Sequence, residues 1–273
     1  MLVKNSFNYA REISVESFME TIAYGKCQNV FTEKQFMKHW IKCLEKNQSV
    51  IADGWYNPPP YGMAILSGGI EYPSRISFAS LRTESNWPKD IPINWSEGLL
   101  YAYSSAVNKH SGMPGDFALT LYFGKDNRII NHFKNTYQAT MEVIEQLESI
   151  GSSKELYITA ETIFKRYNLK NCVISKTDIV PTDLGHTLPV VLGESCYRLS
   201  KKDIDLISKS RCFINAYSDW KFDDGMQFTI EPQLVSTQDC TLPQVSYHFL
   251  INKDGQFQVA DDVKRILQTY NLI

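Results

Sequence analysis

The sequence predicts an α+β fold built from two similar halves, with helices on one side of a curved antiparallel sheet. Helical patterns and strand-like runs follow one another in the order helix, helix, strands, and the same order then returns. In both halves the helices lead to a proline-containing approach to a strand, "GWYNPPPYG" first and "TDLGHTLP" later. No Gly/Ser-rich or charged linker divides the 273 residues. We therefore expect one domain over 1–273, with halves at about 14–97 and about 98–273.

The first half begins with two predicted helices. Ser14 or Ser17 can cap the first helix, and Thr32 followed by Gln35 forms a capping box for the second. Apolar residues recur at helical spacing in both, at Val15, Phe18, Met19 and Ile22, then at Phe36, Met37, Trp40, Ile41 and Leu44. The runs "MAILSG", "RISFASL", "GLLYAYSSAV" and "DFALTLYFG" are rich in aromatic and β-branched residues, so they predict the strands of a sheet.

The second half repeats this order. A long amphipathic helix is expected over about 131–150, ended by Gly151, and Ser152 with Glu155 begins another. The later strand "GMQFTIEPQL" carries Glu231 on the face opposite Phe228 and Ile230. Two interpretations stay open for Glu231, namely a polar site and a solvent-facing carboxylate near a strand end.

Composition excludes several classes of function. The net charge of −2, the pI near 6.2 and the scattered lysines give no basic surface for nucleic acid. No apolar run reaches about 18 residues, and "MLVKNSFNYAREIS" is too polar for a signal-peptide core, so we expect a cytoplasmic protein without membrane association. The six cysteines lack metal-binding spacing and are expected to be reduced structural thiols.

Three residues stand out because each lies in an apolar, strand-like context: Asp116 in "GDFALTLYFG", His186 in "LGHTLP" and Glu231 in "FTIEPQL". Two carboxylates and one imidazole together suit a first-row divalent metal ion with open coordination positions. Each residue also has a purely structural interpretation. Asp116 would then begin a strand, His186 would be a hydrogen-bonded core histidine, and Glu231 would lie at the surface.

These segments resemble a known superfamily. "GMQFTIEPQL" resembles the strand "G-M-x-F-T-I-E-P" of the methionine aminopeptidase, Xaa-Pro aminopeptidase and creatinase superfamily. "LGHTLP" stands where that family has "G-H-G-I-G", and "GDFALTLYFG" stands where it has a glycine–aspartate strand. The resemblance covers about 98–255, and it implies the pita-bread fold, a pseudo-duplicated α+β domain.

The resemblance also implies a set of metal ligands. The family binds two metal ions with five ligands, of which Asp116, His186 and Glu231 match three. The remaining two positions fall on Ser105 and Ser246, whose neutral hydroxyls cannot replace carboxylates. His248 shares a strand face with Ser246 and is either a substitute ligand or a hydrogen-bonded strand histidine. The resemblance therefore implies a site with one divalent ion (Fe, Mn, Co or Zn) or with none.

The catalytic apparatus of the peptidases is incomplete here. The family's second histidine falls on Gly193, beside Glu194, and "SLRTESNWPKDIP" lacks the histidine that precedes the metal strands. We take Glu231, His186 and Glu194 as candidate catalytic residues. Trp55, Tyr56, Arg82 and Trp87 lie on segments that rim the family's cleft, where they would suit a small ligand with an apolar body and a carboxylate. Their structural alternative is packing on a polyproline II stretch, with Arg82 in a surface ion pair.

The predicted function is that of a diverged enzyme of this superfamily. It would act on a small amino-acid-like or amidino substrate, by C–N bond hydrolysis or related chemistry at a single-metal or metal-free site. The main alternative is a non-catalytic pita-bread protein that binds a peptide or protein partner. A true metal-dependent aminopeptidase ranks third, because a fold does not carry chemistry without its residues. A homodimer is compatible with the sequence.

Overall fold

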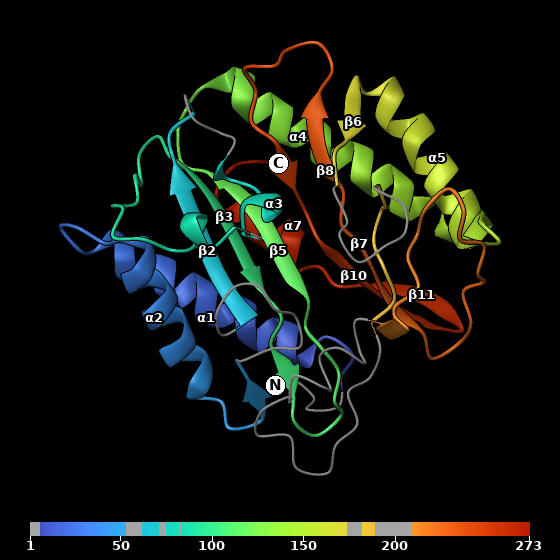
Figure 1. Ribbon diagram of the computed structural model, residues 1–273, viewed down its shortest axis with the longest axis horizontal. Helices are drawn as coiled ribbons and strands as arrows, with labels where there is room; N and C mark the ends of the chain where they lie inside the picture. The colour runs from blue at the N-terminus through green and yellow to red at the C-terminus, as the bar shows by residue number, and fades with distance from the viewer. Residues whose placement is uncertain (1–5, 53–61, 71–74, 82, 174–181, 189–208) are drawn as a thin grey trace. The chain divides into compact units, whose positions relative to one another are not determined.

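The computed structural model describes residues 6–52, 62–70, 75–81, 83–173, 182–188 and 209–273 (Figure 1). By its contacts the chain divides into two compact units. Unit 1 is Met1–Gly124 with Pro189–Ser210, and unit 2 is Lys125–Leu188 with Arg211–Ile273. The prediction of a single domain over the whole chain stays a prediction.

Unit 1 begins with helices α1 (Tyr9–Lys26) and α2 (Glu33–Glu45). The capping box of α2 is confirmed, because the Thr32 side chain accepts from the Gln35 amide and the Gln35 side chain accepts from the Thr32 amide. The predicted caps of α1 are wrong. Ser14 and Ser17 lie inside this helix, which begins earlier because Tyr9 and its neighbour Ala10 extend the buried face by one turn.

The sheet of unit 1 is antiparallel, in the order β2 (Met63–Gly68), β3 (Leu99–Ser104), β5 (Phe117–Tyr122). A two-stranded ladder joins β1 (Val50–Ile51) to β4 (Val107–Asn108). Helices α1 and α2 pack on β5 through Phe117, whose ring centroid lies 5.8 Å from that of Phe18 and 6.4 Å from that of Trp40 (Figure 1). This packing holds the start of β5, where Asp116 lies.

One predicted strand of unit 1 is wrong. "RISFASL" contains the short helix α3 (Phe78–Leu81), and the 3-10 helix η3 (Glu84–Asn86) follows it. Ser77 and Leu81 are both buried and lie one helical turn apart. Burial at this helical spacing overrides the strand preference of Ile76 and Phe78.

Unit 2 contains helices α4 (Asn127–Glu145), α5 (Ser153–Arg166) and α7 (Asp262–Thr269), and the 3-10 helix η4 (Leu147–Ser149). The predicted helix over about 131–150 starts earlier, because the Asp126 side chain caps it by accepting from the Arg128 amide. The cap of α5 by Ser152 is confirmed. No helix in the part of the chain that the structure describes is both long enough and apolar enough to cross a membrane.

The described part of unit 2 also contains two antiparallel sheets. One has the order β11 (Gln256–Val259), β10 (Phe249–Asp254), β7 (Gln227–Ile230), and the other has the order β6 (Leu169–Asn171), β8 (Gln233–Ser236), β9 (Val245–Ser246). The chain passes from β7 to β8 through Glu231 and Pro232. A proline between two ladders costs no ladder hydrogen bond. Glu231 is therefore held at the end of one strand and just before the next.

Candidate active site

The centre of the candidate site in unit 2 is the Glu231 carboxylate. In the ladder between β7 and β10, Ile230 pairs with Phe249, so the next residue beyond the ladder on each strand is Glu231 or His248. The Glu231 side chain is 13% exposed, and its amide donates to the Leu184 carbonyl at 2.8 Å. Glu231 is thus neither a free surface carboxylate nor fully enclosed, which favours the polar-site interpretation.

His186 reaches Glu231 because its segment, 184–188, is hydrogen-bonded on both sides. On one side the Thr229 amide donates to the His186 carbonyl at 2.9 Å, and on the other the Thr187 amide donates to the Cys212 carbonyl at 2.9 Å. Gly185 permits this contact, because a Cβ atom on it would lie 2.0 Å from the Thr229 carbonyl oxygen, and its φ is 153°. The glycine before His186 is therefore a packing requirement.

Replacing Gly185 with alanine should reduce the free energy of unfolding by about 1–3 kcal/mol, because the new methyl group forces 184–188 away from β7 or strains its backbone. Denaturant unfolding measures the loss. Gly151→Ala is the matched control, since its Cβ would meet only the Glu155 side chain at 3.6 Å, and it should change stability by less than about 0.5 kcal/mol. Equal effects of the two substitutions would contradict the close approach at Gly185.

The protonation state of His186 follows from its neighbours. The Arg211 guanidinium donates to His186 Nε2 at 3.4 Å, and since a guanidinium has no acceptor, Nε2 must carry a lone pair. The ring Nδ1–H then donates to the Thr187 carbonyl at 3.0 Å. Burial first, and then Arg211, lower the pKa of His186 from 6.5 to about 3, against a smaller rise from the Thr187 hydrogen bond. His186 is a neutral imidazole at pH 7.

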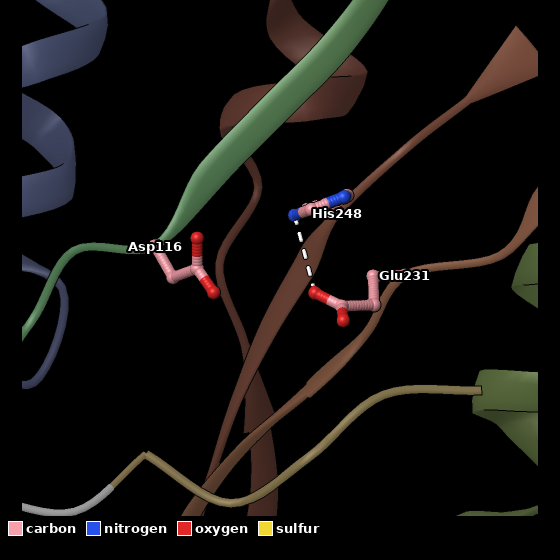
Figure 2. A group of neighbouring side chains, drawn as sticks. All are labelled: Asp116, Glu231 and His248. Atoms are coloured by element: carbon pink, nitrogen blue, oxygen red, sulfur yellow. Dashed lines mark ion pairs between the residues drawn. The ribbon is translucent and has the colours of Figure 1, made fainter. Parts of the chain in front are cut away.

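Both oxygens of Glu231 lie near an imidazole. Oε1 is 3.6 Å from His186 Nε2. Oε2 is 3.3 Å from His248 Nδ1, the ion pair marked in Figure 2. The Thr229 hydroxyl also donates to Oε2 at 3.2 Å. His248 is 3% exposed and His186 is 5% exposed. Unit 2 therefore holds one carboxylate between two buried imidazoles. One of these imidazoles is His248, whose place in the site the sequence had given only as an alternative.

Arg211 is the residue of this site that the sequence analysis missed. It is 9% exposed, and its guanidinium carbon lies 5.3 Å from the centre of the Phe213 ring as well as near His186. An arginine in "SKSRCFIN" carries no local signal, because its partner is 25 residues earlier in the chain. This cation changes the chemistry available to His186, because it occupies the Nε2 lone pair.

Asp116 belongs to unit 1 and immediately precedes β5. It is 3% exposed, and its backbone carbonyl accepts a hydrogen bond from the buried guanidinium of Arg11, which also lies over the Phe117 ring. Gly115 allows this contact, since a Cβ there would lie 2.3 Å from the Arg11 amide nitrogen. Arg11 therefore holds the backbone of Asp116, a role that the sequence analysis did not predict. The role of Asp116 as a metal ligand stays a prediction.

The other predicted positions are only partly described. Ser105 is buried, and its hydroxyl donates to the Gly62 carbonyl at 3.2 Å. Ser246 is buried in β9. The half-buried Trp87 donates its indole N–H to the Leu81 carbonyl at 2.7 Å. Trp55, Tyr56, Arg82 and Glu194 lie outside the described residues, so their predicted roles stay predictions.

Comparison with known proteins identifies the fold. No family model and no curated protein matches the chain. The solved X-Pro aminopeptidase from Thermotoga maritima MSB8 is 13% identical with a TM-score of 0.60, over 93% of this chain and 59% of that one. The prolidase from Pyrococcus horikoshii OT3 is 16% identical with a TM-score of 0.59, over 93% and 60%. The methionine aminopeptidase from Rickettsia prowazekii is 12% identical with a TM-score of 0.57, over 93% and 94%.

The chain thus spans about three-fifths of the length of the first two structures and nearly all of the third. Identities this low establish a shared fold and do not transfer an activity. The fold class expected from "GMQFTIEPQL" and its companion segments is confirmed. This protein has the pita-bread α+β fold of the aminopeptidase and prolidase structures.

Proposed function

We propose that this protein is a hydrolase that cleaves a C–N bond of a small amino-acid-like or amidino substrate, at a site centred on Glu231 and His186. The observation that carries the proposal is the Glu231 carboxylate between two buried imidazoles, in a fold that aminopeptidase and prolidase structures share. Buried ionisable groups are costly, so a cluster of them is more often kept for chemistry than for stability.

In the single-metal form of this proposal, the donor set would hold one ion. Two ligands of one ion can be about 4.2 Å apart at most when each bond is near 2.1 Å. The separations of 3.6 Å and 3.3 Å between Glu231 and its two histidines fall below this limit. In this proposal Asp116 joins Glu231 and His186, as the resemblance implies. A bound Fe, Mn, Co or Zn ion would polarise a carbonyl or lower the pKa of a water molecule.

A second metal ion does not fit the residues present. Ser105 donates its hydroxyl to a carbonyl, and Ser246 brings no charge, so neither replaces a carboxylate. Without a second ion there is no bridging hydroxide. Ordinary aminopeptidase activity therefore remains the third choice, after the hydrolase and the binding protein.

The roles of the protein side chains follow from their proton affinities and contacts. His186 is too weak a base for neutral pH, because its pKa of about 3 lies far below it, so His186 serves as a ligand or hydrogen-bond acceptor. Glu231 Oε1 is the better proton acceptor, since Oε2 already accepts from Thr229. Glu231 would take a proton from the attacking water and deliver it to the leaving nitrogen as the C–N bond breaks.

The second candidate function is non-catalytic binding of a peptide or protein partner. The observation that favours it is the Arg211 guanidinium against His186 Nε2, the nitrogen that would face a metal ion. Under both candidates we propose cytoplasmic action, no nucleic-acid partner and a ligand with a carboxylate. Arg82, Trp55, Tyr56 and Trp87 would contact that ligand, with Glu194 as a further catalytic candidate. The proposed assembly is a homodimer.

A hydrolysis panel tests the proposed function. Purified protein should release the amine from at least one N-acyl amino acid, amidino acid or short peptide, with EDTA or with added Mn²⁺, Co²⁺ or Zn²⁺. Glu231→Gln should abolish this release. His132→Gln is the matched control, because His132 is a buried histidine of the same unit that bonds the Pro243 carbonyl at 2.9 Å.

Release that survives Glu231→Gln would contradict the proposed role of the carboxylate. No release from any compound, together with a rise in melting temperature on adding one of them, would replace the hydrolase with the binding protein. Such a rise is readily seen, because a ligand at about a hundred times its dissociation constant stabilises by about 2.7 kcal/mol.

A further inference from the structure

The contact between Arg211 and His186 is unusual for a site that resembles a metal centre. Within unit 2, the guanidinium Nη1 donates to His186 Nε2 at 3.4 Å. His186 Nε2 itself lies 3.6 Å from Glu231 Oε1. Arg211 is buried and also lies over the Phe213 ring. The buried guanidinium therefore contacts both the His186 imidazole and the Phe213 ring.

We propose that the Arg211 guanidinium takes the place of a metal ion at His186, so that the site carries a built-in cation and excludes metal ions from Nε2. The inference concerns the same site as the proposed function, and it rests on that function in this respect alone. It decides between the single-metal and the metal-free forms of that function in favour of the metal-free form.

Geometry makes the two cations mutually exclusive. A metal ion binds an imidazole about 2.1 Å from the nitrogen, along the direction of its lone pair. An N–H donor uses the same direction. With Nη1 at 3.4 Å from Nε2, an ion on that line would lie about 1.3 Å from the guanidinium nitrogen, far inside any contact distance. The ion can bind Nε2 only if Arg211 leaves.

The charge of Arg211 also opposes the binding of a metal ion at His186. The guanidinium is always protonated, so its positive charge next to the His186 imidazole does not depend on metal supply. A divalent ion would have to displace a cation that packs against Phe213 and hydrogen-bonds His186. The neutral imidazole, with Nδ1–H fixed by the Thr187 carbonyl, already presents its lone pair to that cation.

Cobalt titration of three variants tests the inference without any assay of activity. Arg211→Gln removes the charge, Arg211→Lys keeps it, and Arg166→Gln is the matched control, because Arg166 is an exposed arginine of the same unit paired with Glu142. Calorimetry and the visible absorption of Co²⁺ report affinity and coordination. Circular dichroism and the melting temperature establish that each variant is folded.

We expect Arg211→Gln to bind one Co²⁺ per chain at least about tenfold more tightly than the wild type, with Arg211→Lys and Arg166→Gln unchanged. The double variant Arg211→Gln/His186→Gln should lose the gain, which places the ion at His186. The inference is overturned if the wild type binds one ion as tightly as Arg211→Gln does, or if the folded Arg211→Gln protein gains no affinity.

A second measurement covers the case in which Arg211→Gln does not fold. In the wild-type protein, nitrogen NMR of the histidine rings should show His186 as the Nδ1–H tautomer, and excess Zn²⁺ should leave its Nε2 signal unchanged. A Zn²⁺-dependent shift of that signal overturns the inference. Exclusion of Zn²⁺ without hydrolysis of any substrate would contradict the proposed function alone, and hydrolysis with a tightly held ion at His186 would contradict the inference alone.

Discussion

Replacing Glu33 with alanine should lower the free energy of unfolding by about 3–5 kcal/mol, the usual cost of breaking a buried ion pair by removing one partner. Glu33 is completely buried at the first turn of α2. Its carboxylate accepts from both terminal nitrogens of Arg75, at 2.6 Å and 2.8 Å, and from the amide of Lys89 at 2.9 Å. The amide and hydroxyl of Ser67 donate to it as well. Removing the carboxylate leaves the Arg75 charge without its anionic partner, with only the carbonyls of Ser67 and Asn86 as acceptors among the described residues. The Ser67 and Lys89 donors lose their acceptor as well.

Denaturant unfolding measures this effect, and two variants make it specific. Lys34→Ala breaks the neighbouring exposed pair with Asp90 and should cost no more than about 1 kcal/mol. The double variant Glu33→Ala/Arg75→Ala should be less destabilised than the sum of its single variants, because the second substitution removes the unpaired charge. A Glu33→Ala loss no larger than that of Lys34→Ala would show that the network does not stabilise unit 1.

Acidification should destabilise the protein through His186 by about 3 kcal/mol between pH 7 and pH 4, since each unit of pKa difference corresponds to about 1.36 kcal/mol. Burial, and secondly Arg211, lower the pKa of His186 to about 3 in the folded state, against 6.5 for an unburied histidine. Between these values the unfolded chain binds the proton and the folded chain does not. The stabilisation is therefore complete above about pH 6.5 and is lost progressively as the pH falls toward 3.

The measurement is the free energy of unfolding at several pH values in EDTA, for the wild type and His186→Gln. The variant should lose the His186 part of the acid dependence, although carboxylates continue to contribute below about pH 5. His132→Gln should remove a smaller part in the same direction, because burial also lowers the pKa of His132. If the wild type and His186→Gln have parallel pH profiles, His186 is not the neutral buried imidazole described here.

Local patterns in the sequence predicted much of the fold. Thr32 with Gln35 and Ser152 with Glu155 marked the starts of α2 and α5 correctly, because a cap involves residues only three positions apart. "MAILSG" and "DFALTLYFG" became β2 and β5. Local patterns were wrong where burial overrode them. α1 begins before the serines expected to cap it, and "RISFASL" contains a helix.

The sequence by itself identified three residues of the candidate site. Glu231, His186 and His248 were all singled out from strand alternation or from the resemblance, and unit 2 brings them together. The glycine in "LGHTLP" was part of the same motif, and the packing of Gly185 on Thr229 gives its physical reason.

Only the tertiary structure decided which charges meet. Glu33 looks from the sequence like an ordinary acidic residue in a first helical turn, and it is buried because Arg75, 42 residues later, lies against it. Arg211 has no local pattern at all, and from 25 residues away it fixes the tautomer of His186 and adds to the lowering of its pKa by burial. Periodicity and capping report hydrogen bonds and burial within a few residues. The pairing of distant side chains depends on the path of the backbone between them, which no short stretch of sequence contains.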